Sequence, residues 1–160
     1  MPHIQIQMAE LNDAVAIASV LDESFREYKS LYTREGYAAT TPNSEQIKNR
    51  IRLNEGPTWL ALYDDRIVGT VSAVKKKMAL YIRSMAVRPA ARGKKIGELL
   101  LIEVEIFASE NGYKRLFLST TSFLTRAIRL YEHFGFYRIN EGPDNLFGTP
   151  LFTMEKVLEP

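Results

Sequence analysis

The most constraining feature of the sequence is the stretch MAVRPAARGKKIGELLL, which occupies residues 85–101. It begins as an apolar run, passes a proline and a basic loop containing two glycines, and at once becomes a leucine-rich pattern with helical spacing. A strand followed directly by a helix is the repeating unit of α/β proteins, in which helices cover a sheet. The stretch therefore predicts an α/β fold in which a basic loop joins a strand to a helix.

Hydrophobic spacing predicts the remaining elements. Alternation over residues 3–9 indicates a first strand, and apolar residues three and four apart indicate a helix that begins after Asn12. Asn43 and Gln46 form a capping-box pattern that opens a second helix, whereas residues 28–42 lack a stable period and indicate a loop or a broken helix. Further strands are predicted at residues 58–63, 67–74, 78–87, 115–119, 136–140 and 151–157, and further helices at residues 96–107 and 125–134.

These elements give the order β-α-α-β-β-β-α-β-α-β-β, a mixed α/β (α+β) arrangement. Its first half is mostly antiparallel, and the strand–helix–strand pattern after Met78 predicts a right-handed parallel crossover. The chain has 160 residues, 46% of them hydrophobic, and shows no internal repeat or linker. We therefore expect a single domain over residues 1–160 with one packed core.

Composition argues against several classes of protein. No apolar run reaches the roughly 18 residues of a membrane-spanning helix. The N-terminal sequence MPHIQIQMAE lacks the pattern of a secretion signal, which predicts a cytoplasmic protein. Without cysteine the chain has no disulfide, thiol nucleophile or cysteine-ligated metal. Only His3 and His133 offer imidazole, and they lie far apart in sequence, so we expect no metal site.

Positive charge is concentrated in one segment. The net charge is only +2, but residues 75–95 contain eight basic residues and no acidic one, which leaves −6 for the rest of the chain. This pattern predicts that an anionic ligand binds at one place on the surface. A nucleic-acid-binding module is disfavoured, because duplex binders need a broad basic face and no aromatic residues interleave the lysines here.

The basic loop, residues 92–97, has the chemistry of a phosphate site. A helix N-terminus presents unpaired backbone N–H groups and a partial positive charge, and glycine lets the main chain approach a ligand closely. The spacing of Gly93 and Gly97 matches neither the P-loop nor the dinucleotide-binding fingerprint. From the residues alone, the loop is either a pyrophosphate site or an ordinary solvated turn.

The same loop resembles a known signature. VRPAARGKKIG is similar to the acetyl-CoA motif of the GCN5-related N-acetyltransferases (GNAT), [QR]-x-x-G-x-[GA], which follows a strand ending in Val-x-Pro. Arg92 and Gly97 match the ends of this motif, whereas Lys95 stands where the family usually has glycine. If that position requires a left-handed backbone, lysine there costs about 1–2 kcal/mol.

A second segment strengthens the resemblance. RAIRLYEHFGF, residues 126–136, is similar to the family segment A-x-x-L-Y-x-x-x-G-F, and the order of elements fits the family over essentially the whole chain. The family often has Asn where this chain has Leu124. Thr120, Thr121 and Ser122 are the candidates to take over that contact.

The resemblance implies a fold and an activity. The fold is the GNAT fold, a mixed central sheet of about six to seven strands flanked by about four helices. The activity is direct transfer of an acetyl group from acetyl-CoA to a primary amine, without an acyl-enzyme. The alternative is an inactive acetyl-CoA-binding or sensor protein of the same fold, which Lys95 and Leu124 favour and Tyr131 disfavours.

The resemblance also implies residue roles. Tyr131 matches the family's usual general acid, which serves the leaving CoA thiolate. Judged by helical spacing alone, it shares a face with Ala127, Leu130 and Phe134 and is a core tyrosine. The strand and the basic loop would hold the pantetheine arm and the pyrophosphate through Met85, Ala86, Val87, Arg92, Gly93, Lys94, Lys95, Ile96 and Gly97.

Residues 28–42 are expected on the acceptor side of the site. Glu23, Glu27 and Glu35 are candidate general bases there, or ordinary surface acids. The acceptor is a small-molecule amine if this segment encloses the site, and a peptide amine if it leaves an open groove. A homodimer to which the C-terminal strand contributes is a further expectation from the family.

Overall fold

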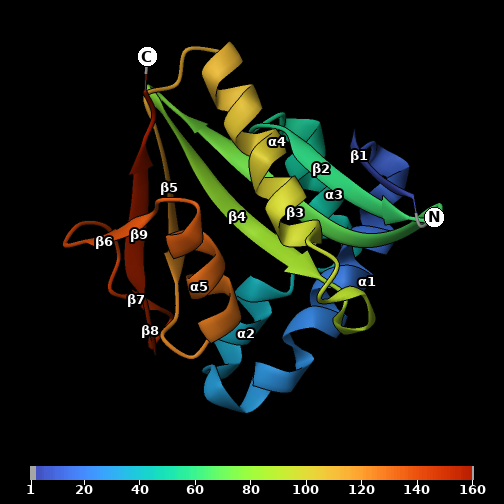
Figure 1. The fold of residues 1–160 in the computed structure, drawn as a ribbon. Helices are drawn as coiled ribbons and strands as arrows, with labels where there is room; N and C mark the ends of the chain where they lie inside the picture. The colour runs from blue at the N-terminus through green and yellow to red at the C-terminus, as the bar shows by residue number, and fades with distance from the viewer. Residues whose placement is uncertain (1–2, 160) are drawn as a thin grey trace.

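The computed structural model describes residues 3–159, and its centre is a seven-stranded mixed sheet (Figure 1). The strands lie in the order β1-β2-β3-β4-β5-β9-β6, and β4 and β5 run parallel to each other. The predicted mixed α/β fold and parallel crossover are confirmed, and residues 1, 2 and 160 of the predicted domain lie outside the described residues. The sheet strands are β1 Ile4–Met8, β2 Thr58–Tyr63, β3 Arg66–Lys76, β4 Ala79–Val87, β5 Arg115–Thr120, β6 Tyr137–Ile139 and β9 Phe152–Val157.

Helices cover both faces of the sheet. The longest, α4, lies across one face with α5 beside it, and α1 and α3 pack on the opposite face (Figure 1). The pleat of β2 sends Leu60 to the α1 side and its neighbour Ala61 to the α4 side. The helices are α1 Ala14–Phe25, α2 Arg34–Thr40, α3 Ser44–Leu53, α4 Ile96–Glu110 and α5 Thr125–His133, with short 3₁₀ turns η1 Leu11–Asp13, η2 Arg26–Leu31 and η3 Pro89–Ala91.

The parallel pair at the centre of the sheet separates partway along its length. Pairing between β4 and β5 ends at Ile82 and Leu118, yet β4 continues to Val87 and β5 to Thr120. Figure 1 shows the two strands diverging toward α1 and α2. Beyond Ile82, β4 is therefore unpaired on its β5 side, where its edge faces an opening, while its other edge stays paired with β3.

A β-bulge lies in this unpaired part of β4. Against β3, Arg83 pairs with Ser72 and Ala86 pairs with Thr70, so two residues of β4 oppose one residue of β3. Ser84, inside the bulge, has a positive φ of 54°. Bulges of this kind redirect side chains and are frequent beside active sites.

The segment between α1 and α3 is more regular than the sequence pattern indicated. Residues 28–42 contain the end of η2 and the whole of α2, whose N-cap Thr33 accepts a hydrogen bond from Gly36 N at 3.0 Å. The Thr33 N–H donates to Thr149 Oγ1 at 2.8 Å, which ties α2 to the hairpin of β7 Asn145–Leu146 and β8 Thr149–Pro150. The sequence pattern did not indicate this hairpin because its strands are two residues long.

Within residues 3–159, no helix combines the length and apolar character needed to cross a membrane.

Candidate active site

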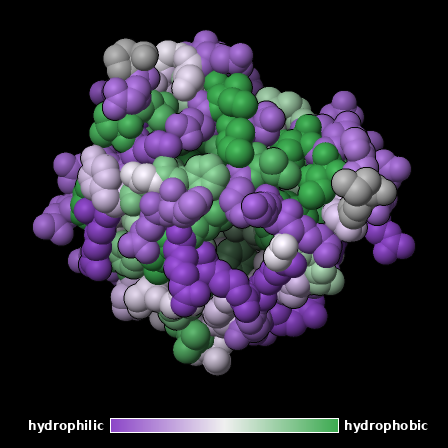
Figure 2. All heavy atoms as spheres, viewed as in Figure 1, coloured by the Kyte–Doolittle hydropathy of each residue, from purple (hydrophilic) through white to green (hydrophobic). Residues whose placement is uncertain are grey.

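A cavity of about 640 Å³ opens where β4 and β5 separate. Its walls come from the unpaired part of β4, the end of β5, the basic loop and the first turn of α4, and α5. Residues of α1, η2, α2 and the β7–β8 hairpin line it from the other side. Figure 2 shows the hollow on this face, with a hydrophobic floor and a largely hydrophilic rim.

The basic loop adopts the conformation of an anion site. Lys95 is left-handed at φ 61° and ψ 26° as it caps α4, and Gly93 has φ 82°. The backbone N–H groups of residues 93–98 donate to no backbone acceptor within residues 3–159. These donors stand at the positive end of the 15-residue helix α4, where an anion is stabilised. The loop therefore fits the pyrophosphate of coenzyme A.

Lys95 keeps the backbone conformation for which the family uses glycine, so it stores strain in the loop. Lys95→Gly should remove the left-handed penalty of about 1–2 kcal/mol while adding some unfolded-state entropy. We expect the free energy of unfolding to rise by about 0.5–1 kcal/mol in urea denaturation. An equal or lower free energy of unfolding would mean that the lysine side chain itself stabilises the loop. Lys94→Gly, in the same loop, is the control for the added flexibility.

Gly97 fixes the close approach of α4 to its neighbours. A Cβ atom added there would meet Leu130 Cδ2 at 2.9 Å and Met85 Cε at 3.3 Å. Gly97, Leu130 and Met85 all line the cavity. A side chain at position 97 would therefore occupy space between α4, α5 and β4 that belongs to the cavity.

The predicted cofactor residues gather at this cavity with one difference. Met85, Ala86, Val87, Arg92, Gly93, Lys95, Ile96 and Gly97 line it. Lys94 does not, and its ammonium lies 5.3 Å from the centre of the Tyr63 ring. The Arg92 guanidinium is engaged by Glu27, with 2.6 Å between Nη2 and Oε1. Arg92 is thus held at the rim by a carboxylate that an incoming phosphate would have to displace.

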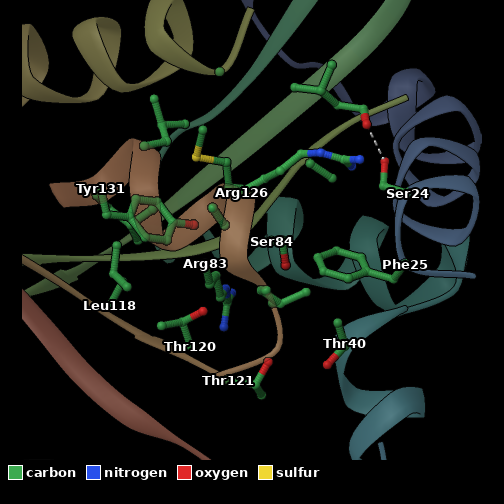
Figure 3. A pocket seen from close by; sticks show the side chains of 18 of the residues that line it. Ser24, Phe25, Thr40, Arg83, Ser84, Leu118, Thr120, Thr121, Arg126 and Tyr131 are labelled. Carbon is green, nitrogen blue, oxygen red and sulfur yellow. Dashed lines mark hydrogen bonds between the residues drawn. The ribbon is translucent and has the colours of Figure 1, made fainter. Parts of the chain in front are cut away.

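Tyr131 projects from α5 into the cavity with its ring in the core. The residue is 8% exposed, and its ring packs against Phe136 with 5.8 Å between centroids. Figure 3 shows its hydroxyl directed toward the open space between α5 and α1. Burial raises the pKa of Tyr131 well above its ordinary value, and Tyr32 and Tyr81 add to the rise. The hydroxyl therefore remains protonated throughout the neutral pH range.

The candidate general bases do not reach the cavity. Glu23 forms an ion pair with Arg88, Glu27 pairs with Arg92, and Glu35 lies exposed in the first turn of α2. Among residues 3–159, the carboxylate that lines the cavity is that of Glu98, next to the basic loop on α4. Of the described residues 28–42, those that line the cavity are Tyr28, Tyr32, Ala39 and Thr40, and none of these carries a carboxylate.

Arg50, Arg83 and Ser84 are among the polar lining residues to which the sequence pattern assigned no role in the site. Arg50 comes from α3 and donates to Ser84 Oγ at 2.9 Å, although the two residues are 34 positions apart. Arg83 stands inside the apolar strand ALYIRSMAV, and a charge in such a run is the signal that would have identified it. The sequence pattern did not single out Arg50, because a cation on an amphipathic helix is ordinary.

Leu124 lies at the N-cap of α5 and makes no side-chain capping hydrogen bond. It lines the cavity together with Thr120 and Thr121, which are buried, whereas Ser122 is exposed and does not line it. The Thr121 hydroxyl has no hydrogen-bond partner within the described residues. Thr121 is therefore the best placed of the three to offer a ligand the contact that Asn often makes in the family.

Comparison with known sequences decides the family. The sequence model of the Acetyltransferase (GNAT) family matches residues 17–136, which include the basic loop and Tyr131. The chain belongs to the GNAT family. The uncharacterized N-acetyltransferase YjgM of Escherichia coli is 32% identical over 134 residues, covering 81% of this chain and 80% of that protein. The N-acetylaspartate synthetase of Danio rerio is 35% identical over 88 residues, covering 54% of this chain and 31% of that protein.

A solved GNAT structure has the same fold. PaiA N-acetyltransferase from Thermoplasma acidophilum, in complex with coenzyme A, superimposes with a TM-score of 0.83 at 21% identity and covers 98% of this chain and 99% of that chain. The predicted GNAT fold is therefore confirmed. The protein is an acetyltransferase of the acetyl-CoA-dependent GNAT class, whose members act on small-molecule or peptide amines.

Proposed function

We propose that this GNAT protein transfers the acetyl group of acetyl-CoA directly to a primary amine, with Tyr131 as general acid. The observation that carries the proposal is that the free N–H groups of the basic loop and the Tyr131 hydroxyl open onto one cavity. Acetyl-CoA supplies a thioester whose carbonyl carbon the amine attacks. A nitrogen–carbon bond forms, the carbon–sulfur bond breaks, and the products are an amide and coenzyme A.

The chain's own groups bind and orient the cofactor. The basic loop offers backbone donors and the dipole of α4 to the pyrophosphate. Met85, Ala86 and Val87 belong to the part of β4 that has no partner in β5, so backbone groups on that edge can serve the pantetheine arm, although the Val87 carbonyl already accepts a hydrogen bond from Ser24 Oγ at 2.9 Å. A backbone N–H of this segment would polarise the thioester carbonyl, as oxyanion-hole donors do.

Tyr131 serves the leaving thiolate of coenzyme A. A thiolate leaving group has a conjugate acid with pKa near 8.5, so a tyrosine stabilises it chiefly through a hydrogen bond from the hydroxyl. The raised pKa of Tyr131 keeps this donor protonated under the conditions in which amines are nucleophilic. Burial of the ring fixes the position of the hydroxyl oxygen.

The acceptor is proposed to react as the free amine, because no carboxylate lines the acceptor side. Below the pKa of the acceptor amine, kcat/KM should rise about tenfold per pH unit, in proportion to the free base. The measurement is a pH–rate profile with saturating acetyl-CoA and two acceptors whose amine pKa values differ. A plateau at the same pH for both acceptors would instead reveal a general base on the enzyme.

The test of the proposed function is release of the coenzyme A thiol. The protein is mixed with acetyl-CoA and a panel of primary amines, thiol is followed with a chromogenic disulfide, and the acetylated amine is identified by mass spectrometry. Amine-dependent release of thiol with matching product is expected. Binding of acetyl-CoA without turnover of any amine would favour the alternative, an inactive acetyl-CoA-binding or sensor protein.

A further inference from the structure

The acceptor half of the cavity is unusually cationic. Arg50 from α3 and Arg83 from β4 both line it. Ser84, in the β-bulge, follows Arg83 in the sequence and accepts a hydrogen bond from Arg50. Figure 3 shows Arg83 and Ser84 between Tyr131 on one side and Thr40 on the other. The remaining cations that line the cavity, Arg92, Lys95 and Arg126, lie at the basic loop and at the start of α5.

Arg50 is a partly desolvated cation without a carboxylate partner. Its guanidinium donates to the neutral Ser84 hydroxyl, and it forms no ion pair within residues 3–159. Burial lowers the pKa of Arg50 to about 10, and the neighbouring Arg83 contributes to the decrease. A guanidinium removed from water is stable only when anions and acceptors compensate it, so this site is set up to receive an anion.

Arg83 is only partly compensated. Its Nη2 lies 2.9 Å from Glu55 Oε1, at an ion pair whose side chains are 25% and 35% exposed. Its Nε is buried and has no hydrogen-bond partner among the described residues. Within residues 3–159, the one ion pair that the two guanidiniums form is with Glu55, which does not line this cavity. One net positive charge and at least one buried donor remain for a ligand.

We infer that the amine acceptor is a small amino acid-like molecule whose carboxylate is bound by Arg50 and Arg83. This inference rests on the proposed acetyl transfer and specifies its substrate class. Guanidinium groups bind carboxylates through two parallel N–H···O bonds, which fixes orientation as well as charge. Binding the carboxylate end at the bulge would direct the amine toward the part of β4 that follows, Met85 to Val87, where the thioester is proposed to lie.

The same two arginines select against other amines. A diamine brings a second ammonium group toward two guanidiniums, and like charges at short range oppose binding. A carboxamide keeps the size of the amino acid but removes the negative charge that would pair with Arg50. Both comparisons test the carboxylate directly.

The first experiment compares acceptors on the native enzyme. L-Aspartate, L-alanine, L-alaninamide and 1,4-diaminobutane are assayed with acetyl-CoA, and kcat/KM is expressed per free amine. The carboxylate-bearing amines should exceed the amide and the diamine by at least about tenfold, as expected for charged hydrogen bonds. Equal or better turnover of the amide or the diamine would overturn the inference and leave the proposed function standing.

The second experiment removes the cation. Arg50→Gln should raise KM for the carboxylate acceptor by about 10- to 100-fold, leave kcat within about threefold and leave the Kd for acetyl-CoA unchanged. Arg50→Lys should restore part of the loss because it keeps the charge. Arg52→Gln is the matched control, since Arg52 lies on the same helix, is exposed, donates a hydrogen bond to Asn49 and does not line the cavity. An unchanged KM in Arg50→Gln would contradict the assignment.

Failure of the inference and failure of the proposed function give different results. If the native enzyme binds acetyl-CoA but releases thiol neither with these four amines nor with the wider panel of primary amines, the proposed acetyl transfer is contradicted along with its substrate class. If it acetylates amines and Arg50→Gln lowers activity toward L-alaninamide as much as toward L-alanine, Arg50 is structural and the inference alone fails.

Discussion

Replacing Tyr131 by phenylalanine is expected to lower kcat by about 10²- to 10³-fold and to leave the Kd for acetyl-CoA unchanged. The variant removes only the hydroxyl, while the ring keeps its packing against Phe136 in the core. General acid catalysis by a positioned side chain contributes about 10²–10⁴ in rate. The measurement is steady-state thiol release, combined with calorimetric titration of the cofactor.

Tyr113→Phe is the matched control for this prediction. Tyr113 packs against Phe107 near the end of α4, does not line the cavity, and should keep native kcat. A kcat for Tyr131→Phe within about threefold of native would show that the leaving thiolate is protonated by another group or by water. A parallel rise in the Kd for acetyl-CoA would show that Tyr131 acts in binding instead.

Gly97→Trp is expected to weaken acetyl-CoA binding by about 10- to 100-fold. The first atom of any side chain at this position already meets Leu130 and Met85, and the rest of an indole has no space except the cavity. The indole would occupy volume that the cofactor needs, and a 10- to 100-fold rise in Kd corresponds to a loss of about 1.4–2.8 kcal/mol of binding free energy. Calorimetric titration with acetyl-CoA measures the effect.

Two further variants separate loss of the site from loss of the fold. Ile106→Trp places the same side chain on α4 at a position that is 45% exposed, so its Kd for acetyl-CoA should stay native. Gly97→Ala adds one methyl group that Leu130 can accommodate by a small shift, and should weaken binding less than Gly97→Trp. Native binding by a folded Gly97→Trp protein, as judged by circular dichroism and urea unfolding, would place the cofactor elsewhere.

The fold and the cofactor half of the site were predictable because their signals are local. The basic loop is recognisable from its glycines and cations at a strand-to-helix junction, and the α5 segment has its own motif at residues 126–136. Sequence neighbours remain spatial neighbours across such a junction. The sequence predicted a left-handed backbone at Lys95 only if the loop follows the family pattern, and the structure has that conformation there.

The acceptor half was not predictable because it is assembled by pairing between distant segments. Arg50 meets Ser84 only after α3 packs near the bulge of β4, and the bulge depends on the register against β3. Charge counted along the chain was also misleading. Lys75 and its neighbours lie at the β3–β4 turn, the opposite end of β4 from the basic loop, so the cationic segment does not meet one ligand at one place.

Ion pairing explains why two of the predicted general bases do not reach the cavity. Glu23 lies in the last turn of α1 and pairs with Arg88, and Glu27 lies in η2 and pairs with Arg92. Both arginines belong to the segment that follows β4. A sequence shows that acids and bases are present but not which of them pair. The two pairs instead join α1 and η2 to Arg88, just after β4, and to Arg92, at the start of the basic loop.

The measurement that tests the central claim most directly is calorimetric titration of the native protein with acetyl-CoA. We expect one site per chain with a Kd in the micromolar range, the usual range for substrates of enzymes of this kind. Displacement of acetyl-CoA by free coenzyme A at that site is expected as well. Absence of binding at millimolar acetyl-CoA would contradict the assignment of the cavity, the basic loop and Tyr131 to acetyl transfer.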